Sequence, residues 1–389
     1  MDQSSKELEQ AWRRFADRIG ALDAVVLQEG APGSPRDRAE GYRYLARLVA
    51  ANLDLWIKRG DPDNPQVFWV NDTWGLPNAD GFYTSVPLRG DAVYEVTGRR
   101  GTVHWLNFQV TAGWFGTGTA MRVVSEVSDD QIAADGEGRF TLVLGGPKRE
   151  GNWLPLADDA SALTIRQFFY DWDTETRAEV EIERLDARSA PEAPDPAEFA
   201  KRLDMVASIM QATADFGPKR AIAGRTHMAN AFGAPASAAN ELGINRNVYA
   251  GGHFVLGPDE ALILEVRPPS KCRYWGIQVG SFWMEPIDFA NHQSSLNGHQ
   301  AVLDPDGVFR AVVSAKDPGI PNWLDTAGHS EGPMLIRWLE CDTGPRPTTK
   351  KVAFDEVRKA LPAATAVVTP AQRAEILARR RAHVARRYR

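Results

Sequence analysis

Apolar residues recur at helical spacing near the start of the chain. One set follows alternating intervals of four and three residues, which predicts an amphipathic helix with a single buried face. Its members are Leu8, Trp12, Phe15, Ile19, Leu22 and Val26. A second helix is predicted from Pro35 to just before Gly60, where a Gly-Asp-Pro sequence ends it.

After the second helix the pattern changes to short apolar runs separated by Gly, Asn, Asp and Pro, which indicates strands. Strands are predicted at 66–70, 81–87, 92–97, 102–110, 139–144, 162–170 and 179–184. A proline-rich stretch at 189–197 is the predicted linker. Beyond it, apolar residues from Phe199 to Phe216 predict another helix. Further strands are predicted at 248–255, 261–267, 274–279, 308–313 and 334–340.

Two parts of the chain resemble each other in order and spacing. Asn152-Trp153-Leu154 follows a strand and a Gly-Pro turn, and Asn322-Trp323-Leu324 follows a strand and a Pro-Gly turn. Further pairs occur in the same order: Trp105 with Trp275, Phe140 with Phe309, and Arg166 with Arg337. Duplication is the simplest explanation. Because Asn-Trp-Leu occurs in both copies, we expect it to be architectural, with Asn bonding the turn backbone and Trp closing the end of a sandwich.

The predicted fold class is α+β and rich in β structure. We expect two tandem homologous units, each with a leading helix and an antiparallel, jelly-roll-like β-sandwich, and helical extensions at both ends. The predicted segments are an N-terminal helix (1–34), a first unit (35–188), the linker (189–197), a second unit (198–345) and a basic helical tail (346–389).

The net charge of −6 is unevenly distributed. From Lys350 onward there are eleven Lys and Arg against three Asp and Glu, so the tail is basic and the rest acidic. Thr369-Pro370 predicts the start of a C-terminal helix, with a thin apolar stripe beneath a solvated arginine face. The stripe consists of Ile376, Leu377, Val384 and Tyr388. We expect the tail to pack on the acidic body or on a second copy, which makes a homo-oligomer through the terminal helices possible and disfavours nucleic acid as a partner.

The sequence also bears on location. The first residues are polar and acidic, unlike a secretory signal, and no apolar run is long enough to predict a membrane span. The expected location is cytoplasmic. Cys272 and Cys341 lack metal-ligand spacing; a disulfide between strands is an option, but free thiols are expected in that compartment.

The second copy resembles a known family. It contains Leu264-Glu-Val-Arg-Pro-Pro269, Tyr274-Trp-Gly-Ile-Gln-Val279, Pro286-Ile-Asp288 and Asn322-Trp-Leu324 in that order. In this it is similar to the bacterial domain of unknown function 1214, often found with its companion 1254, over about 250–345 and more loosely over 80–186. The resemblance implies an antiparallel β-sandwich of unassigned activity. The chain departs from the family in the polar run 291–299, where the family tends to have an arginine- and serine-rich turn.

Histidines found in only one copy are the first candidates for chemistry. His253, His292 and His299 lie in the second copy, and Asp288 precedes His292 by four residues. A histidine oriented by a carboxylate is the usual general base. No H-x-H, H-x-x-x-H or H-E-x-x-H spacing occurs, so no metal is predicted.

An acidic run offers a second candidate. Asp171-Trp172-Asp173-Thr174-Glu175 is similar to the short acidic signature of some isoprenoid cyclases, in which one protonated aspartic acid is the general acid. Strand spacing would place Asp171 and Asp173 on one side. The other interpretation is a solvated strand end.

Aromatic residues complete the predicted site as the lining of a cleft between the copies. They are Trp105, Trp114, Phe115, Tyr274, Trp275 and Trp283. The glycine-rich stretch 113–119 has no phosphate-binding signature and is predicted to be a lid or turn. The lack of P-loop, dinucleotide and G-x-S-x-G motifs disfavours NTPases, Rossmann dehydrogenases and serine hydrolases, and no cofactor is predicted.

The favoured hypothesis is an enzyme that acts on a hydrophobic or polycyclic small molecule by metal-independent His/Asp acid–base chemistry, as a lyase, isomerase, cyclase or hydrolase. Two alternatives stay open. One is a non-catalytic glycan- or lipid-binding sandwich protein, and the other is an oligomeric assembly protein that uses the basic tail.

Overall fold

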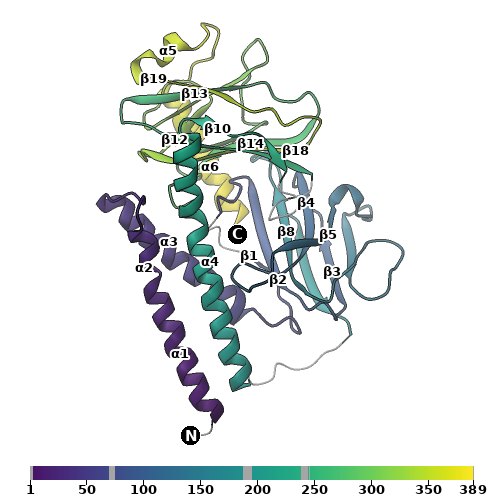
Figure 1. Ribbon diagram of the computed structural model, residues 1–389. Helices are drawn as coiled ribbons and strands as arrows, with labels where there is room; N and C mark the ends of the chain where they lie inside the picture. The colour runs from purple at the N-terminus through teal and green to yellow at the C-terminus, as the bar shows by residue number, and fades with distance from the viewer. Residues whose placement is uncertain (1–2, 70–74, 187–194, 238–243, 245, 389) are drawn as a thin grey trace. The chain divides into compact units, whose positions relative to one another are not determined.

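The chain forms two compact units, shown in the computed structural model of Figure 1. The structure describes residues 3–69, 75–186, 195–237, 244 and 246–388. Unit 1 comprises 1–74, 81–168 and 176–216, and unit 2 comprises 75–80, 169–175 and 217–389. Unit 2 thus includes two short segments that interrupt unit 1 along the sequence, and the division between the units falls inside a helix, after Phe216. Most of the predicted linker lies outside the described residues.

Unit 1 combines helices with two sheets. Its helices are α1 (Gln3–Ala21), α2 (Asp23–Leu27), α3 (Pro35–Leu53), the π-helical turn η1 (Asp54–Lys58), the 3-10 turn η2 (Asp129–Gln131) and the first part of α4 (Pro196–Met228). Helices α1, α3 and α4 lie side by side (Figure 1), and Tyr44 of α3 donates a hydrogen bond to the Thr213 carbonyl of α4 at 3.0 Å. Helix α3 begins where predicted, with Ser34 as its N-cap and Pro35 in its first turn.

The sheets of unit 1 pack face to face. Their strands are β1 (Phe68–Trp69), β2 (Gly81–Pro87), β3 (Tyr94–Arg99), β4 (Trp105–Ala112), β5 (Arg122–Ser128), β6 (Arg139–Leu144), β7 (Trp153–Leu154), β8 (Ala160–Phe168) and β9 (Glu179–Arg184). One sheet has the order β1-β2-β8-β4-β5 and the other β7-β6-β3-β9. Phe108 and Phe140 bring the two sheets together, with ring centroids 5.6 Å apart.

Unit 2 repeats this plan. Its strands are β10 (Ala231–Phe232), β11 (Ala236–Ser237), β12 (Asn247–Val255), β13 (Glu260–Val266), β14 (Cys272–Val279), β15 (Ser295–Asn297), β16 (Phe309–Ser314), β17 (Trp323–Asp325), β18 (Glu331–Cys341) and β19 (Thr348–Ala353). The larger sheet has the order β10-β12-β18-β14-β15 with β11 on β12, and the smaller β17-β16-β13-β19. Its helices after α4 are the turn η3 (Phe354–Glu356), α5 (Val357–Ala360) and α6 (Pro370–Arg387).

Matching strand orders confirm the duplicated α+β fold. In each copy a short parallel pair, β6 with β7 and β16 with β17, closes the edge of the smaller sheet. The register refines the correspondence. Arg166 lies opposite Asn107, and Arg337 opposite Gly276, so Trp105 corresponds to Tyr274 and not to Trp275. A shift of one residue in a strand changes the face, so Trp275 lies in the core between the sheets whereas Tyr274 lies on the other side of its sheet.

The Asn-Trp-Leu motifs do the same structural work in both copies. The Asn152 side chain accepts a hydrogen bond from the Ala133 N–H and donates to the carbonyls of Ala133 and Thr141. Asn322 makes the equivalent bonds to Val302 and Arg310. The architectural interpretation of this motif is confirmed.

Three expectations about local structure are wrong. Strands β5, β15 and β19 were not predicted. Strand β19 lies in the tail, which was expected to be helical only, and pairs with β13. Trp12, expected on the buried face of α1 with Phe15, is 59% exposed, and Ala11 is buried beside Phe15 in its place. Cys272 and Cys341 lie opposite each other on β14 and β18 and form a disulfide, where free thiols were expected.

No helix in the described part of the chain has the length and apolar character needed to cross a bilayer.

Candidate functional site

One histidine of unit 2 has the geometry of a general base. His292 ends a turn that begins at Asp288, and β17 places Asp325 beside it, with Nδ1 2.7 Å from a carboxylate oxygen of Asp325. The Asp325 side chain is 9% exposed and the His292 side chain 40%. Asp325 is fixed from its other oxygen by the Ala327 N–H at 2.7 Å. A carboxylate beside Nδ1 favours the tautomer with its proton there and leaves Nε2 as the basic nitrogen.

The carboxylate that orients His292 is not the predicted one. Asp288 instead caps the turn, accepting hydrogen bonds from the N–H groups of Ala290 and Asn291, both at 3.1 Å. Asp325 lies 33 residues beyond His292, too far for local spacing to indicate it. The duplication holds the missing signal, because the residue after Asn-Trp-Leu is Asp325 in the second copy and Pro155 in the first.

The other two predicted histidines have different surroundings. His253 is buried, with Nε2 3.4 Å from Glu331, and Arg225 bonds the same carboxylate at 3.0 Å. His299 is half-exposed, with Nε2 3.7 Å from Asp171. The structure therefore gives each of the three histidines its own carboxylate, and only His292 combines a short contact with an accessible ring.

The acidic run 171–175 is a turn, so the expected strand spacing of Asp171 and Asp173 is wrong. Asp171 accepts hydrogen bonds from the Thr174 hydroxyl at 2.6 Å and from the Asp173 N–H at 2.9 Å. The Thr174 hydrogen bond lowers the pKa of Asp171. A cyclase-type general acid must hold its proton, so this environment favours the opposite state. Asp173 is exposed, and its carbonyl accepts a hydrogen bond from Arg386.

Four of the six predicted aromatic ligand contacts belong to packed interiors. Trp105, Tyr274 and Trp283 are at most 1% exposed and Trp275 is 6% exposed. Trp105 packs on Phe168 with ring centroids 4.9 Å apart. Trp114 and Phe115, both in unit 1, are half-buried in the turn between β4 and β5. They pack against Trp56 and Phe216, so this turn is anchored and does not form a lid.

A buried polar cluster in unit 2 went unpredicted. The Asp80 carboxylate accepts hydrogen bonds from Tyr274 at 2.6 Å, Trp172 at 2.8 Å and Asn297 at 2.9 Å. Burial raises the pKa of Asp80, and burial together with the neighbouring Asp80 raises that of Tyr274 well above its ordinary value. Arg387 lies close enough to oppose the shift at Asp80 and donates to the Ala79 carbonyl at 2.6 Å. The cluster fixes segment 75–80 within unit 2.

Helix α6 buries the face that was predicted to be exposed to solvent. Arg373, Arg380 and Arg387, seven residues apart, are at most 5% exposed, as is His383. The expected apolar stripe is only partly buried. The buried arginines bond backbone carbonyls and polar side chains of unit 2, for example Arg380 with the Phe289 carbonyl at 2.9 Å. The arginine face of α6 is thus largely structural, and Arg379, Arg381 and Arg386 are the ones exposed.

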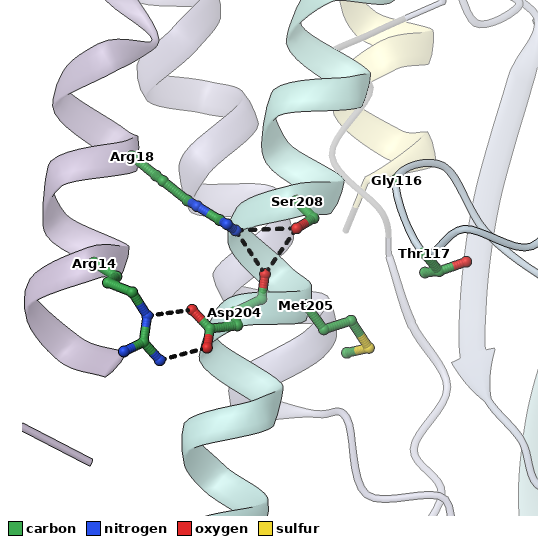
Figure 2. A pocket seen from close by; sticks show the side chains of 7 residues that line it. All are labelled: Arg14, Arg18, Gly116, Thr117, Asp204, Met205 and Ser208. Carbon is green, nitrogen blue, oxygen red and sulfur yellow. Dashed lines mark hydrogen bonds and ion pairs between the residues drawn. The ribbon is translucent and has the colours of Figure 1, made fainter. Parts of the chain in front are cut away.

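Unit 1 contains a separate open pocket of about 570 Å³ (Figure 2). Helix α1 contributes Arg14 and Arg18, and the β4–β5 turn contributes Gly116 and Thr117. Helix α4 supplies the rest of the lining with Asp204, Met205 and Ser208. Both arginines reach from α1 toward α4, and Arg14 forms a two-point ion pair with Asp204 at 2.6 and 3.2 Å.

Across the described residues, no group of three or more His, Cys, Asp and Glu side chains is arranged to hold a metal ion.

Fold and site together define a duplicated, helix-bearing β-sandwich protein with a histidine–carboxylate pair in its second unit. An uncharacterized protein from Burkholderia cenocepacia, whose crystal structure is known, is 32% identical to this chain. The match covers 91% of this chain and 99% of that one, with a TM-score of 0.86. This chain belongs to the same family as that Burkholderia protein.

Other comparisons add no functional information. The VPA0106 protein from Vibrio parahaemolyticus is 12% identical over 80% of this chain and 98% of its own, with a TM-score of 0.47. No family model and no curated protein matches the sequence.

Proposed function

We propose that the protein is an acid–base enzyme in which His292 removes a proton from a small organic substrate or from a water molecule. The pair of His292 with Asp325 carries this proposal. The 2.7 Å contact orients the imidazole, and the exposed part of the ring is open to a substrate. General bases of this kind contribute about 10²- to 10⁴-fold to rate, and neither a metal nor a cofactor is needed for the step.

Asp325 has a positioning role in this proposal. Its carboxylate selects the tautomer and stabilises the imidazolium that forms when His292 takes up a proton. The backbone of β17 and the Ala327 N–H hold the carboxylate in place, so the imidazole loses little entropy when it adopts its reactive orientation.

Fewer observations support the proposed substrate class than support the proposed reaction. A hydrophobic or polycyclic substrate was expected from six aromatic residues, of which only Trp114 and Phe115 are partly accessible, and these lie in unit 1. The proposal therefore rests on proton transfer, with lyase, isomerase and hydrolase chemistry as its outcomes. Membership of the domain of unknown function 1214 family and a cytoplasmic location stay predictions.

The test is a two-part activity screen of the full chain. One part follows hydrolysis of p-nitrophenyl acetate, butyrate and benzoate, and the other follows deuterium exchange into ketones and 2-oxo acids by NMR in D₂O. His292→Asn should lower any turnover by about 10²- to 10⁴-fold. Asp325→Asn should lower kcat more than it changes KM, because it acts through the orientation of His292.

His227 provides a matched control, since it is exposed on α4 of the same unit and is not part of the His292–Asp325 pair. His227→Asn should leave the rate unchanged. Wild-type rates no higher than buffer across both parts, or equal rates for wild type and His292→Asn, would count against the proposal.

A homo-oligomer remains a proposal too. Trp12 is 59% exposed on α1, where it stacks on Phe15 with ring centroids 5.9 Å apart. An exposed tryptophan of this kind suits a protein contact. A Trp12→Gln variant that elutes at a smaller size than wild type in size-exclusion chromatography supports the idea, and an unchanged monomer for both removes it.

A further inference from the structure

We infer that the pocket of unit 1 is a binding site for a small organic monocarboxylate, with Arg18 as the residue that receives the carboxylate. This site is separate from His292, which lies in unit 2, so its test is independent of the acid–base proposal. The three charged residues that line the pocket, Arg14, Arg18 and Asp204, are unevenly paired.

Arg14 and Asp204 satisfy each other. Both carboxylate oxygens of Asp204 accept from the Arg14 guanidinium, at 3.2 Å from Nε and 2.6 Å from Nη2. This two-point ion pair joins α1 to α4 and neutralises one positive charge (Figure 2). A purely structural role for the pocket lining would require only this ion pair.

Arg18 has no carboxylate of its own. Its Nη1 donates to two uncharged acceptors, the Asp204 carbonyl at 3.2 Å and the Ser208 hydroxyl at 3.0 Å. The remaining N–H groups of its guanidinium bond to none of the described residues, and the side chain is exposed to solvent. Arg14, Arg18 and Asp204 together leave one net positive charge, so the pocket suits a single negative charge.

A carboxylate fits better than a phosphate. The guanidinium fork matches two coplanar oxygens. A dianion would bring its second charge next to Asp204, where like charges repel. The volume of about 570 Å³ lies in the range of small-molecule sites, and the Met205 thioether offers an apolar surface to the organic part.

The wall opposite α1 is preformed. Gly116 has φ +73°, and a Cβ there would lie 2.3 Å from the Ser208 carbonyl oxygen, so only glycine lets the turn approach α4 this closely. The Thr117 hydroxyl donates to the Trp114 carbonyl at 2.8 Å and fixes the turn from within. Trp114 belongs to this turn and contacts Trp56, so its fluorescence reports on the site.

The experiment uses the full chain with matched pairs of acid and amide at low ionic strength. Hexanoate and benzoate are compared with hexanamide and benzamide by isothermal titration calorimetry and by tryptophan fluorescence, with inorganic phosphate as a third probe. The carboxylates should bind at least about tenfold more tightly than their amides, because a charge-assisted pair is lost in the amide. Phosphate should bind more weakly than either acid.

Variants locate the site. Arg18→Met should weaken carboxylate binding by about 10- to 100-fold, and Arg18→Lys should weaken it less. Arg13→Met is the matched control, because Arg13 is exposed on the same helix and does not line the pocket, so binding should not change. Gly116→Ala should also weaken binding and shift the fluorescence spectrum.

Equal binding of acids and amides to the wild type would overturn the inference without any variant. So would carboxylate binding that survives Arg18→Met in a folded protein, tighter binding of phosphate than of carboxylates, or no binding of either acid at millimolar concentration.

Discussion

The guanidinium of Arg387 donates two hydrogen bonds to one nitrogen of His383, Nε2, at 3.0 Å from Nε and 2.8 Å from Nη2. Because a guanidinium has no acceptor, Nε2 must be unprotonated. The other ring nitrogen, Nδ1, donates to the Trp172 carbonyl, so the buried imidazole is neutral with a defined tautomer. Burial and the nearby arginines lower the pKa of His383 to about 3.

The first prediction is that acid destabilises the protein through His383. In the unfolded chain a histidine has a pKa of about 6.5, so between about pH 6.5 and 3 the unfolded state binds a proton that the folded state does not. The free energy of unfolding should therefore decrease with falling pH in this window, by about 1.4 kcal/mol per pH unit. Urea unfolding followed by circular dichroism at pH 4 to 7 measures the slope.

His383→Gln is the comparison that isolates this group. Glutamine stays neutral at every pH in the window while keeping one donor and one acceptor. Asp80 acts in the opposite sense, because burial raises its pKa and a folded state that binds protons more readily gains stability as pH falls. The difference between wild type and His383→Gln removes the contribution of Asp80. Parallel pH slopes for the two proteins would show that His383 does not titrate on unfolding.

The second prediction compares adjacent arginines of α6. Arg380 is 4% exposed, donates to the Phe289 carbonyl and to Ser295, and lies 4.6 Å from the ring centre of Trp172. Arg380→Met should lower the free energy of unfolding by about 2–4 kcal/mol, since it leaves buried acceptors unpaired. Arg379 is exposed, and Arg379→Met should change stability by no more than about 0.5 kcal/mol. Similar effects from both substitutions in urea melts would mean that the face of α6 is assigned wrongly.

This helix shows where sequence patterns stop being informative. Periodicity located most of the longer strands and the start of α6, because apolar alternation and capping are local signals. Periodicity assigned the wrong buried face to α6. Apolar spacing cannot show that the backbone carbonyls of residues 289 and 295 accept hydrogen bonds from a buried arginine. Asp325 and Asp80 were missed for the same reason. Each acts through a partner that only the fold brings near, His292 in one case and Tyr274 in the other.

The third prediction concerns the duplicated asparagines. Asn322 and Asn152 make equivalent sets of three backbone hydrogen bonds, but Asn322 is 4% exposed whereas Asn152 is only partly buried. Asn322→Ala should lower the free energy of unfolding by about 2–4 kcal/mol because buried backbone groups lose their partners. Asn152→Ala should cost less, since water replaces part of what is lost. A larger effect at Asn152 in urea melts would contradict this ranking.

The fourth prediction concerns the disulfide of unit 2. Cys272 and Cys341 join β14 to β18 across a sequence separation of 69 residues. In the chain-entropy model, closing a loop of this length lowers the entropy of the unfolded chain and raises the free energy of unfolding by about 4 kcal/mol. Reduction should therefore lower the urea midpoint clearly. Protein alkylated at lysis and then denatured without reductant should show no free thiol by mass spectrometry, and two after reduction. The Cys272→Ser, Cys341→Ser double variant should unfold like the reduced wild type. Two alkylated cysteines in the unreduced protein would instead favour the free thiols expected from the sequence.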